Sequence, residues 1–252
     1  MSDGMRGETK PGGSRQGWAV LVAIGLVGFL LFALLLDAPV TRALTQWPAE
    51  ERAFFAELTG WGESDWILYP TFFVWAAALG LSLFPIGWSA RWAVRAIGSM
   101  SGFTFLAVGA PGLVSAILKR LLGRARPGGL DEFGTLWFEP GSFFQYSLQS
   151  LPSGHATTSF ALAFALVALF GRWLGFAYFL AALIALSRIV LGAHFLSDAL
   201  AGALLGTFGA MLVRNYFAGR GWVFDKEGRN RMLAPLRLIW RRITRPRRRG
   251  SA

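Results

Sequence analysis

Long apolar stretches separated by short polar segments run through residues 18–213. A helix needs about 20 mostly apolar residues to cross the hydrocarbon core of a bilayer. Six stretches reach or approach this length. They are residues 18–36, 66–90, 96–118, 151–171, 173–187 and 189–213. The shortest, residues 173–187, approaches this length only when the apolar residues that follow are included. This pattern predicts an all-α, polytopic membrane protein, built as a bundle of six transmembrane helices.

The segments on either side of this apolar region are polar and basic. They divide the chain into an N-terminal tail (residues 1–17), a six-helix membrane domain (residues 18–213) and a basic C-terminal tail (residues 214–252). The first apolar stretch is longer than the core of a secretory signal, and no small-residue cleavage site follows it. We therefore interpret it as a retained signal anchor.

Composition supports a membrane protein and excludes several other classes. Hydrophobic residues make up 54% of the chain and charged residues 15%. A soluble domain carries about 25% charged residues, so this chain has too few charges to cover a soluble globule. The chain has no cysteine, which excludes a disulfide scaffold, a thiolate zinc site and cysteine catalysis.

The distribution of basic residues predicts how the helices are oriented. Six spans place both termini on the same side of the membrane. If that side is the cytoplasm, the cytoplasmic segments hold 18 of the 25 Lys and Arg residues, as the positive-inside rule expects. We predict an N-in/C-in protein of the cell inner (plasma) membrane.

Ionisable residues gather at the predicted outer ends of the spans, on the periplasmic side. They are Lys119, Arg120, Arg124, Arg126, His155, Arg188, His194 and Asp198. Ionisable groups within or beside spans are costly and normally face a protein interior or a wet cavity. Because these residues share one membrane level, the sequence predicts a single site at the outer face.

The residue types in this site suit chemistry on a phosphoryl group. Lys119, Arg126 and Arg188 supply positive charge and N–H donors for phosphoryl oxygens. Pro-Ser-Gly-His at residues 152–155 opens the fourth predicted helix, and free N–H groups at a helix start bind anions.

The two histidines supply the groups that react. His194 and Asp198 are spaced i, i+4, which on a helix places them on one face. A carboxylate there would fix the imidazole tautomer and leave the other ring nitrogen free to attack. His155 would protonate the leaving oxygen. The alternative is a buried polar pair, His194 with Asp198, that only packs helices together.

Three motifs in this region resemble the signature of the type-2 phosphatidic acid phosphatase superfamily. Residues 119–127 fit Lys-x6-Arg-Pro, residues 152–155 fit Pro-Ser-Gly-His, and residues 187–198 fit Ser-Arg-x5-His-x3-Asp. Each motif alone is weak, but the three in this order form a specific match with no departure. The similarity in helix layout extends over about residues 18–213.

The resemblance implies a role for each matched residue. It implies that His194 is the nucleophile and forms a phosphohistidine, that Asp198 orients it, and that His155 is the general acid and then the general base. The implied phosphate-binding residues are Lys119, Arg126, Arg188, Ser153 and Gly154. No metal or other cofactor is implied. The implied substrate is a membrane lipid phosphate or diphosphate, of the phosphatidate, phosphatidylglycerophosphate, undecaprenyl diphosphate or lipid A type.

Two other functions use similar residues. One is a non-enzymatic membrane protein that binds or transports lipid phosphates. The other is a vanadate-dependent haloperoxidase, a more distant relative in the superfamily, whose members are mostly soluble. The complete set of nucleophile, acid and cations favours the phosphatase over both.

Several segments keep more than one interpretation. Arg120 and Arg124 occupy motif positions without a fixed residue and are left outside the core site. The aromatic segment 128–150 is either a lip that selects the lipid headgroup or an interfacial anchor. Residues 37–65 fit a short amphipathic helix on the outer leaflet.

The C-terminal tail has two interpretations as well. Residues 235–244 place apolar and basic residues on different helical faces, which suits an amphipathic helix on anionic lipids of the inner leaflet. A solvated tail is the alternative. No nucleic-acid partner is expected, and the oligomeric state does not follow from the sequence.

Overall fold

A computed structural model describes residues 15–233, 235–236 and 240 of the protein. Over these residues the fold is helical and contains no β-strand. Its α-helices are α1 (Arg15–Thr45), α2 (Ala49–Thr59), α3 (Asp65–Leu81), α4 (Trp88–Leu122), α5 (Leu130–Phe133), α6 (Gly154–Phe170), α7 (Phe176–Val190) and α8 (Leu196–Gly219). Its short 3-10 helices are η1 (Gly60–Gly62), η2 (Pro127–Gly129), η3 (Tyr146–Leu148) and η4 (Arg172–Gly175).

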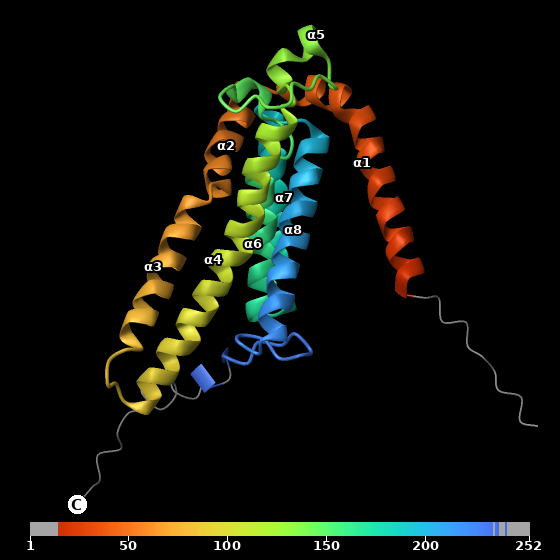
Figure 1. The fold of residues 1–252 in the computed structure, drawn as a ribbon. Coiled ribbons are helices and arrows are strands. Elements are labelled where there is room, and N and C mark those ends of the chain that lie inside the picture. Colours follow the sequence, from red (N-terminus) through yellow and green to blue (C-terminus); the bar gives the residue numbers. More distant parts are fainter. Residues whose placement is uncertain (1–14, 234, 237–239, 241–252) are drawn as a thin grey trace, which may run out of the picture.

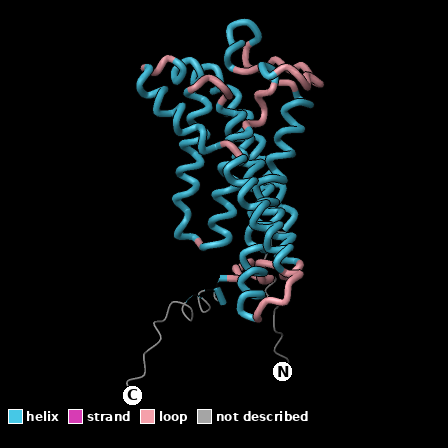
Figure 2. The backbone as a smooth tube through the Cα atoms, turned by 90° about the vertical axis from the view of Figure 1, so that its left-hand side faces the viewer, coloured by secondary structure: helices cyan, strands magenta, loops and turns pink. Residues whose placement is uncertain are grey.

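The long helices run roughly along one axis. Figure 1 shows α4, α6, α7 and α8 packed into a bundle, with α3 beside α4 and α1 diverging on the other side. The backbone tube of Figure 2 shows most of the connections near the two ends of the bundle, while α2 and α3 meet part-way along it. The short α5 caps one end, and the segments around it carry the predicted site.

Among the described residues, four helical segments are long and apolar enough to cross a membrane. They are Val22–Thr45, Trp88–Leu122, Arg172–Val190 and Leu196–Gly219. The helix Gly154–Phe170 is also apolar but shorter. Large apolar side chains point outward along these helices, and Leu113 and Leu212 are 63% and 66% exposed. Such a surface is expected where lipid rather than water surrounds the protein.

Two predicted boundaries at the connection between α3 and α4 are wrong. We expected one span over residues 66–90 and the next from residue 96, but α3 ends at Leu81 and α4 begins at Trp88. The connection contains Pro85 and Gly87. A proline disfavours helix at the residue before it, and this ends α3 earlier than hydropathy alone suggests.

Two boundaries at the site end also differ from the prediction. The helix α1 continues to Thr45, so Asp37 lies inside a helix rather than in a connection after it. The helix α8 begins at Leu196, because Gly192 with φ +67° turns the chain between α7 and α8. His194 therefore precedes α8, and the expectation that it shares a helix face with Asp198 is wrong.

Glycines let α6 and α8 approach closely. A Cβ on Gly206 of α8 would lie 2.2 Å from the carbonyl oxygen of Thr157 on α6. One turn nearer the site, a Cβ on Gly202 would lie 2.4 Å from the carbonyl oxygen of Ser153. Small residues at such contacts allow backbones to pack directly. The starts of α6 and α8 are thereby held together, and Ser153 N donates to the carbonyl of Asp198 at 3.0 Å.

The chain leaves α4 through a left-handed residue and becomes extended. Gly123 adopts φ +63°, and a Cβ there would overlap the carbonyl of Glu139. The following residues pair with the segment that covers the bundle end. Ala125 N donates to Trp137 O at 3.0 Å, and Ser150 N donates to Arg124 O at 3.1 Å. The aromatic segment 128–150 is therefore folded against residues 123–126.

Candidate active site

The predicted site residues lie at one end of the bundle, where four helices begin or end. Lys119 is in the last turn of α4 and His155 in the first turn of α6. Arg188 is in the last turn of α7, and Asp198 is in the first turn of α8. A cavity of about 500 Å³ opens beside Lys119, Gly154 and His155, whereas His194, Arg126 and Arg188 do not line it.

Three cations surround the two histidines. Lys119 lies against the start of α6, since a Cβ on Gly154 would be 3.2 Å from its Nζ atom. Lys119, Arg126 and Arg188 all lie near enough to His155 to act on it electrostatically. Three positive charges gathered at one point favour the binding of an anion.

Arg188 has a donor that the protein leaves unused. Its Nη1 donates to Thr59 Oγ1 at 2.8 Å, which fixes the guanidinium against the end of α2. Its Nε is buried and has no hydrogen-bond partner in the part of the chain that the structure describes. A buried donor without a partner is costly, and a phosphoryl oxygen would satisfy it.

Arg126 is held by backbone carbonyls. Its Nε donates to Tyr146 O at 2.9 Å, and its two terminal nitrogens donate to Ala193 O and Gln149 O at 3.3 and 3.2 Å. The guanidinium carbon lies 3.7 Å from the centre of the Tyr146 ring. Burial lowers the pKa of Arg126 from its ordinary value, yet an arginine stays charged in a protein at neutral pH.

The tautomer of His194 follows from its neighbour. Its Nδ1 lies 2.8 Å from the carbonyl oxygen of Ser150. A carbonyl only accepts hydrogen bonds, so Nδ1 carries the proton and Nε2 keeps a free lone pair. We expected Asp198 to accept this proton, but its nearer oxygen is 3.9 Å from Nδ1. That expectation is corrected: the Ser150 carbonyl fixes the tautomer.

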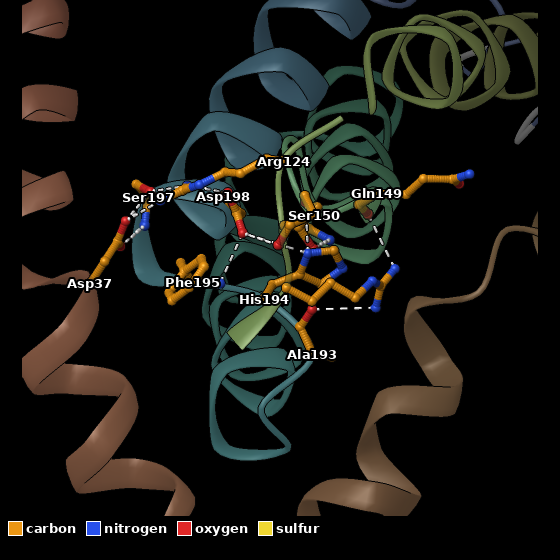
Figure 3. Close-up of polar contacts among 12 residues, drawn as sticks. Asp37, Arg124, Gln149, Ser150, Ala193, His194, Phe195, Ser197 and Asp198 are labelled. Carbon is orange, nitrogen blue, oxygen red and sulfur yellow. Dashed lines mark hydrogen bonds and ion pairs between the residues drawn. The ribbon is translucent and has the colours of Figure 1, made fainter. Parts of the chain in front are cut away.

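Asp198 acts on the residues around His194. Its Oδ2 accepts from the hydroxyl of Ser150 and from Phe195 N at 2.9 Å. The backbone of Ser150 and Phe195 flanks the imidazole, so the carboxylate fixes the walls of the site (Figure 3). Asp198 is completely buried, and its charge lies close to the ring.

The pKa of His194 is lowered. Burial of the imidazole is the main cause, the charge of Asp198 opposes it, and the charges of Arg126 and Arg188 add to it. His194 is only 2% exposed and lies in the turn between α7 and α8. The neutral, nucleophilic form is therefore favoured at neutral pH.

His155 projects from the start of α6 toward η1. A Cβ on Gly62 would lie 2.8 Å from its Cδ2 atom, so the ring occupies the space that this glycine leaves. The neighbouring cavity wall also contains Glu63 and Asp65. The ring of His155 thus faces a cavity from which a leaving group could depart.

Ser153 and Gly154 form the start of α6. The Ser153 hydroxyl oxygen accepts from Ala156 N at 3.5 Å, and the residue is completely buried. This contact caps the helix, a use of the hydroxyl that we did not expect. Gly154 begins the helix beside Lys119, where first-turn N–H groups have no partner within the helix.

Arg124, which we left outside the core site, is part of it. The residue is completely buried, and its guanidinium donates to both Asp198 and Asp37. Sequence reasoning missed it because it occupies a variable motif position and looks like a loop arginine. Arg120, in contrast, donates to Ala116 O within its own helix.

Comparisons with known proteins identify relatives of this chain. A family model described as the PAP2 superfamily matches residues 102–222. A lipid A 1-phosphatase of Rhizobium johnstonii is 31% identical over 208 residues, which cover 82% of this chain and 84% of that protein. A lipid A 1-phosphatase of Rhizobium etli is 30% identical, with 82% and 88% covered.

A solved structure has a similar fold. It is the crystal structure of a transmembrane PAP2 type phosphatidylglycerolphosphate phosphatase from Bacillus subtilis, with a TM-score of 0.50 and 22% identity. The match covers 78% of this chain and 96% of that one. With relatives of this similarity over most of its length, the chain belongs to the PAP2 superfamily, the family that its three motifs resemble.

Proposed function

We propose that this chain is a membrane phosphatase that removes phosphate from a lipid by way of a phosphohistidine on His194. The observation that carries the proposal is the imidazole of His194, buried and held through Nδ1 by the Ser150 carbonyl. Its Nε2 is then the free nucleophilic atom. Membership of the PAP2 superfamily supports the same chemistry.

The proposed reaction has two in-line steps. In the first, Nε2 of His194 forms a bond to phosphorus while the bond from phosphorus to the lipid oxygen breaks. His155 gives a proton to that oxygen, and the lipid alcohol leaves. In the second, His155 takes a proton from water as the water oxygen attacks phosphorus. The P–N bond breaks, and inorganic phosphate is released.

The three cations stabilise the transferring group. Negative charge on the phosphoryl oxygens is spread over three atoms in the transition state. Lys119, Arg126 and Arg188 are proposed to hold these oxygens, with the start of α6 at Ser153 and Gly154 as a further anion site. The unused Nε donor of Arg188 fits this role.

We propose the 1-phosphate of a lipid A-type glycolipid as the first substrate to test. Both curated relatives are named lipid A 1-phosphatase and align with more than four-fifths of the chain. Phosphatidate, phosphatidylglycerophosphate and undecaprenyl diphosphate are the other substrates to compare. All four present an anionic phosphate at a bilayer surface.

We propose six membrane crossings with both termini in the cytoplasm. The site joins the end of α4, the start of α6, the end of α7 and the start of α8, so these helices alternate in direction. The helices α1 and α3 add one crossing each, and α3 and α6 have 17 residues each. This is near the lower limit for a span. The active site would then face the periplasm.

The proposed membrane is the inner (plasma) membrane, with the basic tail on its cytoplasmic leaflet. A tail rich in arginine suits contact with anionic lipids there. The amphipathic segment that we predicted at residues 235–244 lies mostly outside the described residues.

A substrate panel tests the proposed function. Purified chain in detergent with EDTA is assayed for phosphate release from the four lipids, with His194→Ala as the inactive control. We expect release from at least one lipid by the wild type and none by the variant. A protein that only binds or transports lipids would release no phosphate. A haloperoxidase would instead oxidise bromide when given vanadate and peroxide.

A further inference from the structure

A buried ionic cluster lies directly behind the candidate nucleophile. Arg124 sits between the carboxylates of Asp37 on α1 and Asp198 on α8, and the side chains of all three are completely buried. Ser197 links Asp37 to the guanidinium: its hydroxyl donates to Asp37 Oδ2 at 2.6 Å and accepts from Arg124 Nη1 at 2.7 Å. Figure 3 shows the four side chains in one row that leads to His194.

Every N–H group of the Arg124 guanidinium has a partner. Nη1 donates to Ser197 and Asp198, Nη2 donates to Asp37 and Thr135 O, and Nε donates to Thr135 O. The guanidinium carbon also lies 4.6 Å from the centre of the Phe195 ring. A planar five-donor group fits this set of acceptors, and a lysine ammonium does not. The position of Arg124 is thus fixed on all sides.

The cluster leaves one negative charge, and that charge faces the imidazole. Two carboxylates against one guanidinium sum to minus one. Asp198 Oδ1 accepts from Arg124, while Asp198 Oδ2 faces Ser150, Phe195 and His194. During the proposed transfer the imidazole becomes positively charged, because Nδ1 keeps its proton while Nε2 bonds to phosphorus. A fixed carboxylate nearby stabilises that charge.

We propose that Arg124 is a positioning residue for the phosphatase, and that Asp37 anchors it to α1. Arg124 holds Asp198 in place, and Asp198 in turn fixes the residues on either side of His194. Asp37 lies outside residues 102–222, which the family model matches. The first helix therefore contributes to the chemistry as well as to membrane insertion. This inference rests on the proposed role of His194.

A double-mutant cycle on kcat tests the inference. Arg124→Met and Asp198→Asn are made singly and together, and kcat and KM are measured with one lipid phosphate. Residues that orient the ligands of a metal typically contribute about 10- to 100-fold, and we take the same range for Arg124. We expect Arg124→Met to lower kcat by about this factor with KM within about twofold of the wild type. We expect the double variant to match Asp198→Asn alone.

A control variant separates the loss of the Arg124 contacts from the loss of a positive charge in general. Arg42→Met removes an exposed arginine of α1 that pairs with Asp131. We expect its kcat to remain within about twofold of the wild-type value, since no transition-state contact is lost. All rates are divided by the amount of folded protein, which is measured by size exclusion and by thermal unfolding in detergent.

Loss of Arg124 leaves two buried carboxylates without a counter-ion, and the variant can fail to accumulate. The same cycle is then run with Asp37→Asn, which keeps the shape of the side chain and removes the anchor charge. Its expected result is a smaller loss of kcat that is again absent in the Asp198→Asn background.

The outcomes distinguish failure of the proposed function from failure of the role assigned to Arg124. If the wild type releases no phosphate, the proposed function fails. If the wild type is active, the inference is overturned when the losses of the two single variants multiply in the double variant. It is also overturned when KM alone changes, or when folded Arg124→Met and Asp37→Asn proteins keep the wild-type kcat.

Discussion

The Nδ1 atom of His194 lies 2.8 Å from the backbone carbonyl oxygen of Ser150. The acceptor belongs to the main chain. A substitution at residue 150 therefore removes it only if the backbone moves. Asp198 secures that backbone through the hydroxyl of the same Ser150 and through Phe195 N. The Ser150 carbonyl therefore fixes the tautomer of His194, and the Asp198 carboxylate fixes the position of that carbonyl.

Replacement of His194 removes the proposed nucleophile. We expect His194→Gln to lower kcat by at least about 10³-fold, because a group that forms a bond in the transition state has no substitute. Phosphate release in detergent measures the loss. A rapid quench in base, which preserves phosphohistidine, should trap labelled phosphoprotein in the wild type only. Labelled His194→Gln protein would contradict the assignment.

Replacement of His155 separates its acid and base roles. With an alkyl phosphate, whose leaving oxygen needs a proton, we expect His155→Gln to lower kcat by about 10²- to 10⁴-fold. With p-nitrophenyl phosphate the leaving group needs no proton, so the first step should proceed. Hydrolysis of the phosphoprotein should stay slow, which predicts a burst of nitrophenolate equal to the amount of enzyme. Equal losses with both substrates, and no burst, would show that His155 is not the acid.

The lowered pKa of His194 predicts how activity depends on pH. Burial is the main cause of the shift, and it favours the neutral form. Activity that needs neutral His194 is present above the folded-state pKa and is lost as pH falls through it. The ordinary histidine pKa is about 6.5, so the acid limb of kcat/KM should lie below this value. The profile is measured with a soluble substrate, with tryptophan fluorescence as a control for folding. An acid limb above the ordinary value would contradict the prediction.

The interiors of the membrane helices follow directly from hydropathy, but their ends do not. A run of uncharged residues cannot distinguish a helix from an apolar turn, which is why Pro85 and Gly87 fell inside a predicted span. The candidate site residues are predictable because three motifs mark them. Their contacts are not, because they join distant segments: Arg124 and Asp37 are 87 residues apart. Asp37 at the end of an apolar run and Arg124 inside the first motif were the two available signals.

Close packing of α6 on α8 predicts a stability effect at Gly206. An added Cβ would lie 2.2 Å from the carbonyl oxygen of Thr157, and overpacking of this kind costs about 1–3 kcal/mol. We expect Gly206→Ala to lower the thermal unfolding temperature in detergent. The matched control is Gly80→Ala on α3, where an added Cβ meets nothing within 4 Å. Alanine is the better helix former by about 1 kcal/mol, so the control should be neutral or stabilising. An unchanged Gly206→Ala protein would argue against direct backbone contact.

The unused Nε donor of Arg188 predicts how the site responds to a phosphate mimic. Orthovanadate that binds only the folded state should raise the unfolding temperature. At 100 times its Kd, such a ligand adds about 2.7 kcal/mol to the free energy of unfolding. Arg188→Lys keeps a positive charge but loses the planar guanidinium, whose Nη1 is already fixed by Thr59. We expect the vanadate-induced shift to shrink in this variant and to stay intact in Arg42→Lys, which changes an exposed arginine paired with Asp131. If both variants keep the full shift, the buried Nε is not an oxyanion ligand, and the anion is held by Lys119 and Arg126 without it.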